Sequence, residues 1–309
     1  MALIRSIVMV LAATMGASLC AAQSPESSSA QRLFPTPEAA AKALIEACRD
    51  NDSPALVAML GAAYGAEIAK IDDAEEAQHR REFYAQAQAL TKIEPQGDAR
   101  AVLIIGTQRW PVPAPLVKEE GGWRFDSAEG MEELRARRIG ENELSAMEAC
   151  HEFVRAQAEY AAVDRDGDEV REYAQRILST EGKRDGLYWE ADPASRERPS
   201  PLAAFLPDQI DGLRRSSARI PYMGYYFKVL TRQGEGVPGG KYDYVINGNM
   251  IAGYGLVAWP AEYRFSGVMT FVISHQGKLY EKDLGADTAK VVEAMSEYNV
   301  DDTWKPAKP

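Results

Sequence analysis

The sequence predicts an α+β protein built from helices and antiparallel sheets. Apolar residues have the spacing of one helix face within residues 37–60 and 128–163. In residues 101–126 and 225–283 they instead alternate or form short blocks, and turns that contain glycine separate these blocks. Because both patterns occur in each half of the chain, we expect two α+β domains.

The length of the chain indicates the number of domains, and its net charge argues against one class of partner. The chain has 309 residues and a net charge of −11 at pH 7, and a chain of this length typically forms about two domains. We place the first over residues 33–140 and the second over residues 141–309, after a Ser-rich linker at residues 23–32. The acidic balance argues against nucleic acid as a partner, because nucleic-acid-binding proteins present a basic face.

Residues 1–22 have the features of an export signal. Arg5 supplies the positive charge, residues 7–19 the apolar segment, and residues 21–22 (Ala-Ala) the small-residue cleavage site. The apolar run is shorter than the roughly 20 residues that a membrane span needs. We therefore expect a periplasmic or secreted protein with no membrane span in the mature chain, with lipidation of Cys20 or an uncleaved anchor as alternatives.

Two cysteines, Cys48 and Cys150, remain after removal of the signal. In an oxidising compartment they could form one disulfide, which would stabilise the protein by about 4–5 kcal/mol in the chain-entropy model. Cys48 also lies on the apolar face of a predicted helix, with Ala41 and Leu44, so burial in the core is the alternative.

The first domain is expected to begin with helices. Thr36 is a favourable N-cap, Pro37 suits the first helical position, and Ser53-Pro54 marks a second helix start. A third, more polar helix is expected over residues 73–90. The strands that follow are predicted at residues 101–106, 112–118 and 122–126, with a hairpin turn at residues 119–121. This order of elements resembles the cystatin or nuclear-transport-factor-2 type of fold.

The second domain is expected to begin with a long helix. Residues 128–163 are helical in pattern, and Gly140 is the predicted break between a first helix and a second one over residues 141–163. The predicted buried stripe of the second helix comprises Leu144, Met147, Val154, Ala158 and Ala161.

A loop-rich region to residue 211, an antiparallel meander and a helix over residues 287–298 complete the prediction. Asn247-Gly248 is typical of a tight hairpin turn, and Gly253 and Gly255 indicate a bend or a close approach of another backbone. Apolar residues on both faces of residues 268–274 predict a central strand covered on both sides. The five strands are expected at residues 225–230, 241–247, 250–259, 268–274 and 278–283.

The sharpest candidate for chemistry is the acidic segment Asp164-Arg165-Asp166-Gly167-Asp168, followed by Glu172. Carboxylates at alternate positions resemble positions 1, 3 and 5 of an EF-hand loop, and Glu172 would stand at position 9, so calcium is a candidate ligand. Two positions depart from that loop, since Glu169 replaces the Gly of position 6 and Gln175 the Glu of position 12. A solvated acidic loop is the alternative.

Other candidates are weaker. His79, His151 and His275 are far apart in the sequence and match no spacing typical of a metal or catalytic site. Aromatic residues could form a stacking surface for a peptide or glycan, although strands also favour them in the core. The candidate ligand-facing residues are Tyr188, Trp189, Tyr225 and Tyr226.

Several longer segments resemble a known family. They are WPVPAPLVKEEGGWRFD, RRIGENEL, GKRDGLYW, GYYFKVLTRQG, GGKYDYVINGNM, LVAWPAEYRFSGVMTF and LYEKDLGADT. Together they are similar to the exported bacterial family of domain of unknown function 2950, over nearly all of the mature chain. Because the activity of that family is uncharacterised, the resemblance implies no catalytic residues.

The second half also resembles the globular head of type IV pilins and pseudopilins, which combine a long helix with a meander. The N-terminal segment lacks the prepilin signature, so fibre assembly does not follow from this resemblance. We expect an exported envelope protein that is a non-catalytic binding or assembly module, with an envelope protein, peptide or glycan as partner. A periplasmic hydrolase or other envelope enzyme is the alternative, and a pilin-like structural subunit is the third.

Overall fold

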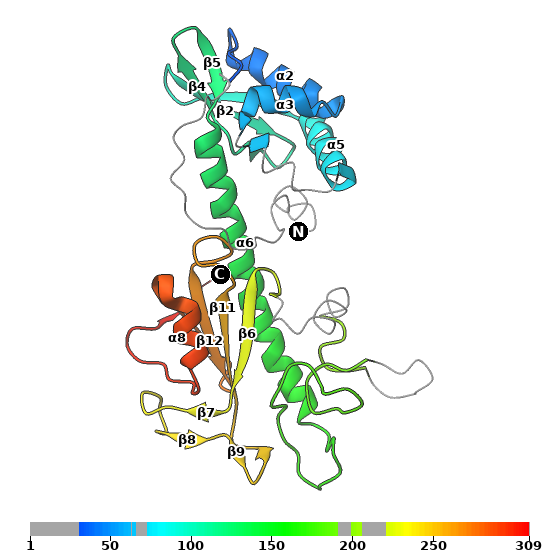
Figure 1. Cartoon of the computed structure of the whole chain (residues 1–309), viewed down its shortest axis with the longest axis vertical. Coiled ribbons are helices and arrows are strands. Elements are labelled where there is room, and N and C mark those ends of the chain that lie inside the picture. The colour runs from blue at the N-terminus through cyan, green and yellow to red at the C-terminus, as the bar shows by residue number, and fades with distance from the viewer. Residues whose placement is uncertain (1–30, 63, 66–72, 191–198, 206–220, 309) are drawn as a thin grey trace. The chain divides into compact units, whose positions relative to one another are not determined.

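The structure is a computed structural model that describes residues 31–62, 64–65, 73–190, 199–205 and 221–308. The predicted export signal and most of the predicted linker lie outside the described residues. The chain divides into two compact units, the first ending at Arg138 and the second beginning at Ile139. Both units combine helices with antiparallel sheets (Figure 1), so the chain is an α+β protein as the sequence predicts.

The first unit packs helices on a small antiparallel sheet. Helix α2 (Pro37–Arg49) begins as predicted, with the Thr36 side chain accepting a hydrogen bond from the Ala39 N–H, and α3 (Ser53–Leu60) begins at the predicted Ser53. Helix α5 spans Asp73–Ala89. The strands are β1 (Thr91–Pro95), β2 (Arg100–Ile105), β3 (Trp110–Pro111), β4 (Leu116–Glu119) and β5 (Gly122–Phe125).

The order of the main strands in this sheet is β1-β2-β4-β5, and β3 also pairs with β2. Leu103, Leu116 and Phe125 are fully buried against α2 and α3 residues. Trp123 is partly buried and packs against the same core. The sequence missed β1 because Lys92 and Glu94 interrupt any apolar alternation there.

Helix α6 spans Ser127–Tyr160 without interruption, so the predicted break at Gly140 is wrong. A single glycine weakens a helix by about 1 kcal/mol relative to alanine, but it retains its backbone N–H and does not end the helix. Within the described residues, no helix is long and apolar enough to cross a membrane.

The second unit contains a five-stranded antiparallel sheet in the order β14-β13-β12-β11-β6. Strand β6 (Tyr225–Leu230) has the predicted bounds, and β12 (Met269–Ser274) and β13 (Leu279–Asp283) begin one residue later than predicted. The remaining strands are β11 (Gly255–Pro260) and β14 (Lys305–Pro306).

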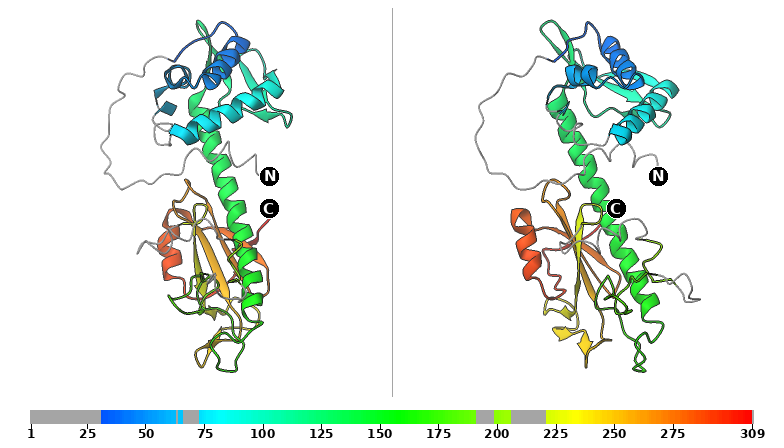
Figure 2. Two further views of the ribbon diagram at one scale, coloured as in Figure 1. Left: turned by 90° about the vertical axis from the view of Figure 1, so that its right-hand side faces the viewer. Right: turned by 45° about the vertical axis from the view of Figure 1, so that its right-hand side comes forward.

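Helices cover the two faces of this sheet (Figure 2). Phe271 and Ile273 of β12 pack with α6 residues, whereas Val272 packs with Val292 of α8 (Thr288–Ala294) on the other face. The prediction of a strand covered on both faces is therefore confirmed. Helix α8 is shorter than predicted because the chain leaves it at Met295, and the Tyr298 N–H then donates to the Arg232 carbonyl.

The buried stripe of α6 in the second unit differs from the predicted one. Leu144 is 52% exposed and Ala158 is exposed, while the buried stripe is formed by Ala146, Met147, Cys150, Phe153, Ala156, Gln157 and Tyr160. Part of the error arises because a polar residue, Gln157, lies in the buried stripe. Its amide donates to the Ala174 carbonyl and accepts from the Ala174 N–H, at 2.8 Å each. A glutamine paired in this way can be buried at little cost.

The strand predicted at residues 241–247 is divided between two short hairpins, whereas the strand predicted at residues 250–259 is confirmed in its second half as β11. Strand β7 (Arg232–Gln233) pairs with β8 (Tyr242–Asp243), and β9 (Val245–Ile246) pairs with β10 (Asn249–Met250). Asn247 and Gly248 have φ values of 53° and 96°, as the predicted tight turn requires. Gly253 has a φ of 140°, and a Cβ there would lie 2.6 Å from the His275 Nδ1 atom, so the close neighbour is a side chain and not a backbone.

Of the two alternatives for the cysteines, the structure supports burial in the core. Cys48 and Cys150 are both buried thiols, and Cys48 belongs to the core of the first unit whereas Cys150 belongs to the core of the second. Two thiols that are each enclosed in a different core cannot bond without opening both cores.

Candidate cation site

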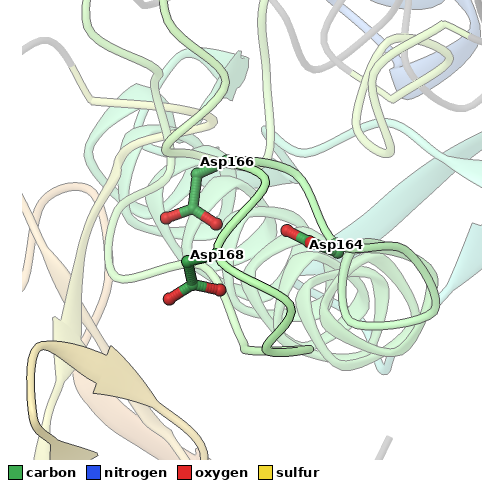
Figure 3. Close-up of side chains that lie close together, drawn as sticks. All are labelled: Asp164, Asp166 and Asp168. Atoms are coloured by element: carbon green, nitrogen blue, oxygen red, sulfur yellow. The ribbon is translucent and has the colours of Figure 1, made fainter.

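The acidic loop of the second unit follows directly after α6. Asp164, Asp166 and Asp168 each offer a carboxylate oxygen, and these three oxygens all lie within 4.8 Å of one another. Figure 3 shows the three side chains on one turn of the loop, with the Asp164 carboxylate directed toward the other two. It is the single group of three or more potential metal ligands among the residues that the structure describes.

Backbone conformation gathers the three carboxylates. The Asp164 carboxylate accepts hydrogen bonds from the Gly167 N–H at 2.8 Å and from the Glu169 N–H at 3.0 Å. Gly167 and Glu169 have φ values of 80° and 68°, so the chain turns sharply at both residues. Glu169 occupies the position of the EF-hand glycine and adopts the positive φ that normally favours glycine.

Hydrogen bonds connect the loop and the residues after it to the β9–β10 hairpin. Asp168 Oδ2 accepts a hydrogen bond from Asn249 Nδ2 at 2.6 Å, and Glu172 Oε2 accepts one from the Met250 N–H at 2.9 Å. Gln175 donates to the Gly248 carbonyl at 2.6 Å. The residue at position 12 of the EF-hand pattern therefore binds the hairpin, so a cation here would be held by a different set of ligands.

The carboxylates of this loop differ in their electrostatic environment. Hydrogen bonds from backbone N–H groups, first that of Gly167, lower the pKa of Asp164. Glu172 shows the opposite shift, because partial burial raises its pKa and the nearby charges of Asp166 and Asp168 add to this effect. The loop thus concentrates negative charge that a cation would offset.

The predicted aromatic surface does not exist as one cluster. Tyr225 is fully buried, with its hydroxyl donating to the Met269 carbonyl at 2.9 Å. Tyr226 lies on the opposite face of β6 and packs near Trp259. Trp189 is buried in the core beside α6, and Tyr188 is half-buried against the same core. Neighbouring residues of a strand point to opposite faces, so Tyr225 and Tyr226 cannot face one ligand.

The three histidines lie on different elements. His79 is in α5, His151 is exposed on α6, and His275 follows β12 at a turn. The His275 ring contacts the rings of Tyr244 and Tyr254 edge-on, and its Nδ1 atom is buried with no hydrogen-bond partner among the described residues. None of these positions joins the aspartate group.

The structure is that of a two-unit α+β protein with a group of three aspartates on a loop of its second unit. The chain matches the family described as "Protein of unknown function (DUF2950)" over residues 31–307 and belongs to that family. No curated protein and no solved structure matches the chain. The likenesses to pilin heads and to the cystatin type of fold therefore stay predictions.

Proposed function

We propose that this protein is an exported, non-catalytic binding or assembly module of the cell envelope, in which one Ca²⁺ ion stabilises the second unit. The observation that supports this proposal is the convergence of Asp164, Asp166 and Asp168. Ca²⁺ binds oxygen ligands at 2.3–2.6 Å. Two oxygens on opposite sides of such an ion are about 4.6–5.2 Å apart, so carboxylate oxygens within 4.8 Å of one another can share one ion.

Three carboxylates supply part of the six to eight oxygen ligands that Ca²⁺ takes, and backbone carbonyls and water would supply the rest. The expected affinity is that of extracellular calcium modules, with dissociation constants of about 10⁻⁴–10⁻³ M. An affinity in this range suits a protein outside the cytoplasm. The export signal that the first 22 residues predict supports such a location.

The ion would act on the hairpin as well as on the loop. Because Asp168 and Glu172 bond to Asn249 and Met250, fixing the carboxylates also fixes β9–β10. This hairpin carries Ile246, and Ile251 follows it directly; the two side chains are 46% and 43% exposed. We therefore expect Ca²⁺ to hold these two exposed apolar side chains in place.

Thermal unfolding tests this proposal. Ca²⁺ at millimolar concentration should raise the melting temperature of the EDTA-treated protein, because an ion that binds only the folded state stabilises it. Asp166→Ala should abolish the shift, because it removes every oxygen ligand of this side chain, whereas asparagine would keep an oxygen that can bind Ca²⁺. Asp302→Ala makes the same change at an exposed residue elsewhere and should leave the shift intact. Equal shifts in both variants, or none in the wild type, would refute the calcium site.

A further inference from the structure

Asn247 differs from the other asparagines of the chain in what its side chain contacts. A hydrogen bond of 2.6 to 2.8 Å holds the side-chain amide of each of the others, which are Asn51, Asn142, Asn249 and Asn299. Asn247 is exposed, and no residue in the described parts of the chain bonds to its amide. The Asn247 side chain can therefore rotate against its own backbone.

The residue after Asn247 is a glycine with an accessible backbone nitrogen. Gly248 is exposed, and its N–H makes no backbone hydrogen bond to any residue that the structure describes. Because glycine has no Cβ, no side chain on residue 248 hinders the approach of this nitrogen to the Asn247 Cγ atom. Asn249 has the opposite surroundings, since the N–H of the next residue, Met250, donates to Glu172.

We propose that Asn247 is a site of deamidation, at which the chain modifies itself without an enzyme. The Gly248 nitrogen loses its proton to hydroxide and forms a bond to Asn247 Cγ, and the side-chain nitrogen takes up a proton from water and leaves as ammonia. Water then opens the succinimide ring at either carbonyl, which leaves aspartate or isoaspartate at position 247. The reaction needs water alone as its co-reactant.

The hairpin turn controls how often this reaction can begin. Asn247 and Gly248 have φ values of 53° and 96°, the two positive values of a type I′ turn. Closing the succinimide ring requires an Asn247 ψ outside the range of that turn, so the turn has to open first. The Gln175 amide opposes this opening most directly, because it donates to the Gly248 carbonyl at 2.6 Å. The rate should therefore follow the population of the open hairpin.

Either product changes the hairpin that is bonded to the acidic loop. Isoaspartate lengthens the backbone of the turn by one carbon atom, and aspartate adds a negative charge two residues before Asn249, which bonds to Asp168. We expect both changes to loosen the attachment of β9–β10 to the loop. This inference goes beyond the proposed function, and it does not depend on calcium because the reaction needs no ion.

Peptide mapping by mass spectrometry tests the site in the full chain. The protein is kept in EDTA at mildly alkaline pH, either folded or in urea, and the conversion of each asparagine is followed over time. In the folded protein Asn247 should convert before the other asparagines, and in urea it should convert faster. A folded protein in which Asn247 stays unconverted, or in which another asparagine converts first, would overturn the proposal.

Two glutamine variants test the control by the turn. Gln175→Ala removes the hydrogen bond to Gly248 and should speed the conversion of Asn247 about fivefold, the effect of one lost hydrogen bond on the open population. Gln108→Ala makes the same change at an exposed residue of the first unit and should leave the rate unchanged. Near-ultraviolet circular dichroism checks that both variants are folded. Equal rates in the two folded variants would contradict control by the turn.

Amide hydrogen exchange followed by NMR tests the consequence in the converted protein. The Met250 N–H, which donates to Glu172, should exchange faster after conversion than before it. The amide of Leu103, in the core of the first unit, should exchange at the same rate in both samples. Unchanged exchange at Met250 would contradict the expected loosening of the hairpin.

Discussion

Glu172 lies just after the acidic loop and bonds to the β9–β10 hairpin. Its carboxylate accepts a hydrogen bond from Met250, which favours the charged form, yet burial and the charges of Asp166 and Asp168 raise its pKa above the ordinary 4.5. For an acid, a raised pKa in the folded state means that ionisation costs stability. The cost is absent below about pH 4.5 and is complete once the pH exceeds the folded pKa.

The raised pKa of Glu172 leads to a prediction for the stability of the calcium-free protein. The free energy of unfolding of Glu172→Gln minus that of the wild type, both measured in urea with EDTA, should increase as the pH rises from 4 to 7. Glutamine keeps an oxygen for the Met250 N–H and has no charge to repel. Glu120→Gln, an exposed site in the first unit, should show no such trend. A difference between Glu172→Gln and wild type that is independent of pH would contradict this assignment.

The spacing of Asp164, Asp166 and Asp168 is visible in the sequence, and it indicated the group that the structure brings together. The conformation of Glu169 was not predictable, because its positive φ depends on hydrogen bonds within the folded loop. The role of Gln175 also depends on a tertiary contact, with Gly248, which is 73 residues away. Local sequence therefore identified the carboxylates but not what holds them.

Helix α6 differs most from the secondary structure that the sequence predicts. It spans Ser127–Tyr160 and contains two glycines with different surroundings. A Cβ at Gly140 would meet nothing within 4 Å, whereas a Cβ at Gly130 would lie 2.8 Å from the Ala114 Cβ. Gly140 therefore has no packing role, whereas Gly130 allows close contact between α6 and the segment before β4.

These surroundings predict opposite effects of the same substitution. Gly140→Ala should stabilise the protein by about 1 kcal/mol, because alanine is the better helix former. Gly130→Ala should destabilise it by about 1–3 kcal/mol through overpacking against Ala114. Urea unfolding of both variants measures the difference, and a loss of stability in Gly140→Ala would mean that the helix needs flexibility there.

Strand prediction succeeded where apolar residues are dense. Strands β6 and β12 follow from their β-branched and aromatic residues, and the turn at Asn247-Gly248 from its two residues. The division of residues 241–259 into short strands was not predictable. It arises because the Tyr244 N–H bonds to Thr231, and because Gly253 turns with a φ of 140° where His275 approaches.

At the scale of the whole molecule, the chain has separate cores in its two units. One core lies between α2, α3 and the sheet of β1–β5. Two others lie on the two faces of the sheet formed by β6 and β11–β14. The aspartate group belongs to the second unit. The stabilising effect of an ion should therefore be local to residues 139–309, since stability is distributed unevenly among cooperative units.

Calorimetric titration of Ca²⁺ into the EDTA-treated full chain tests the calcium site. We expect about one ion per chain, bound with a dissociation constant of about 10⁻⁴–10⁻³ M. In Asp166→Ala the heat of binding should be lost, and in Asp302→Ala it should be retained. A titration without binding heat in the wild type at several temperatures, or binding that survives Asp166→Ala unchanged, would contradict the calcium site.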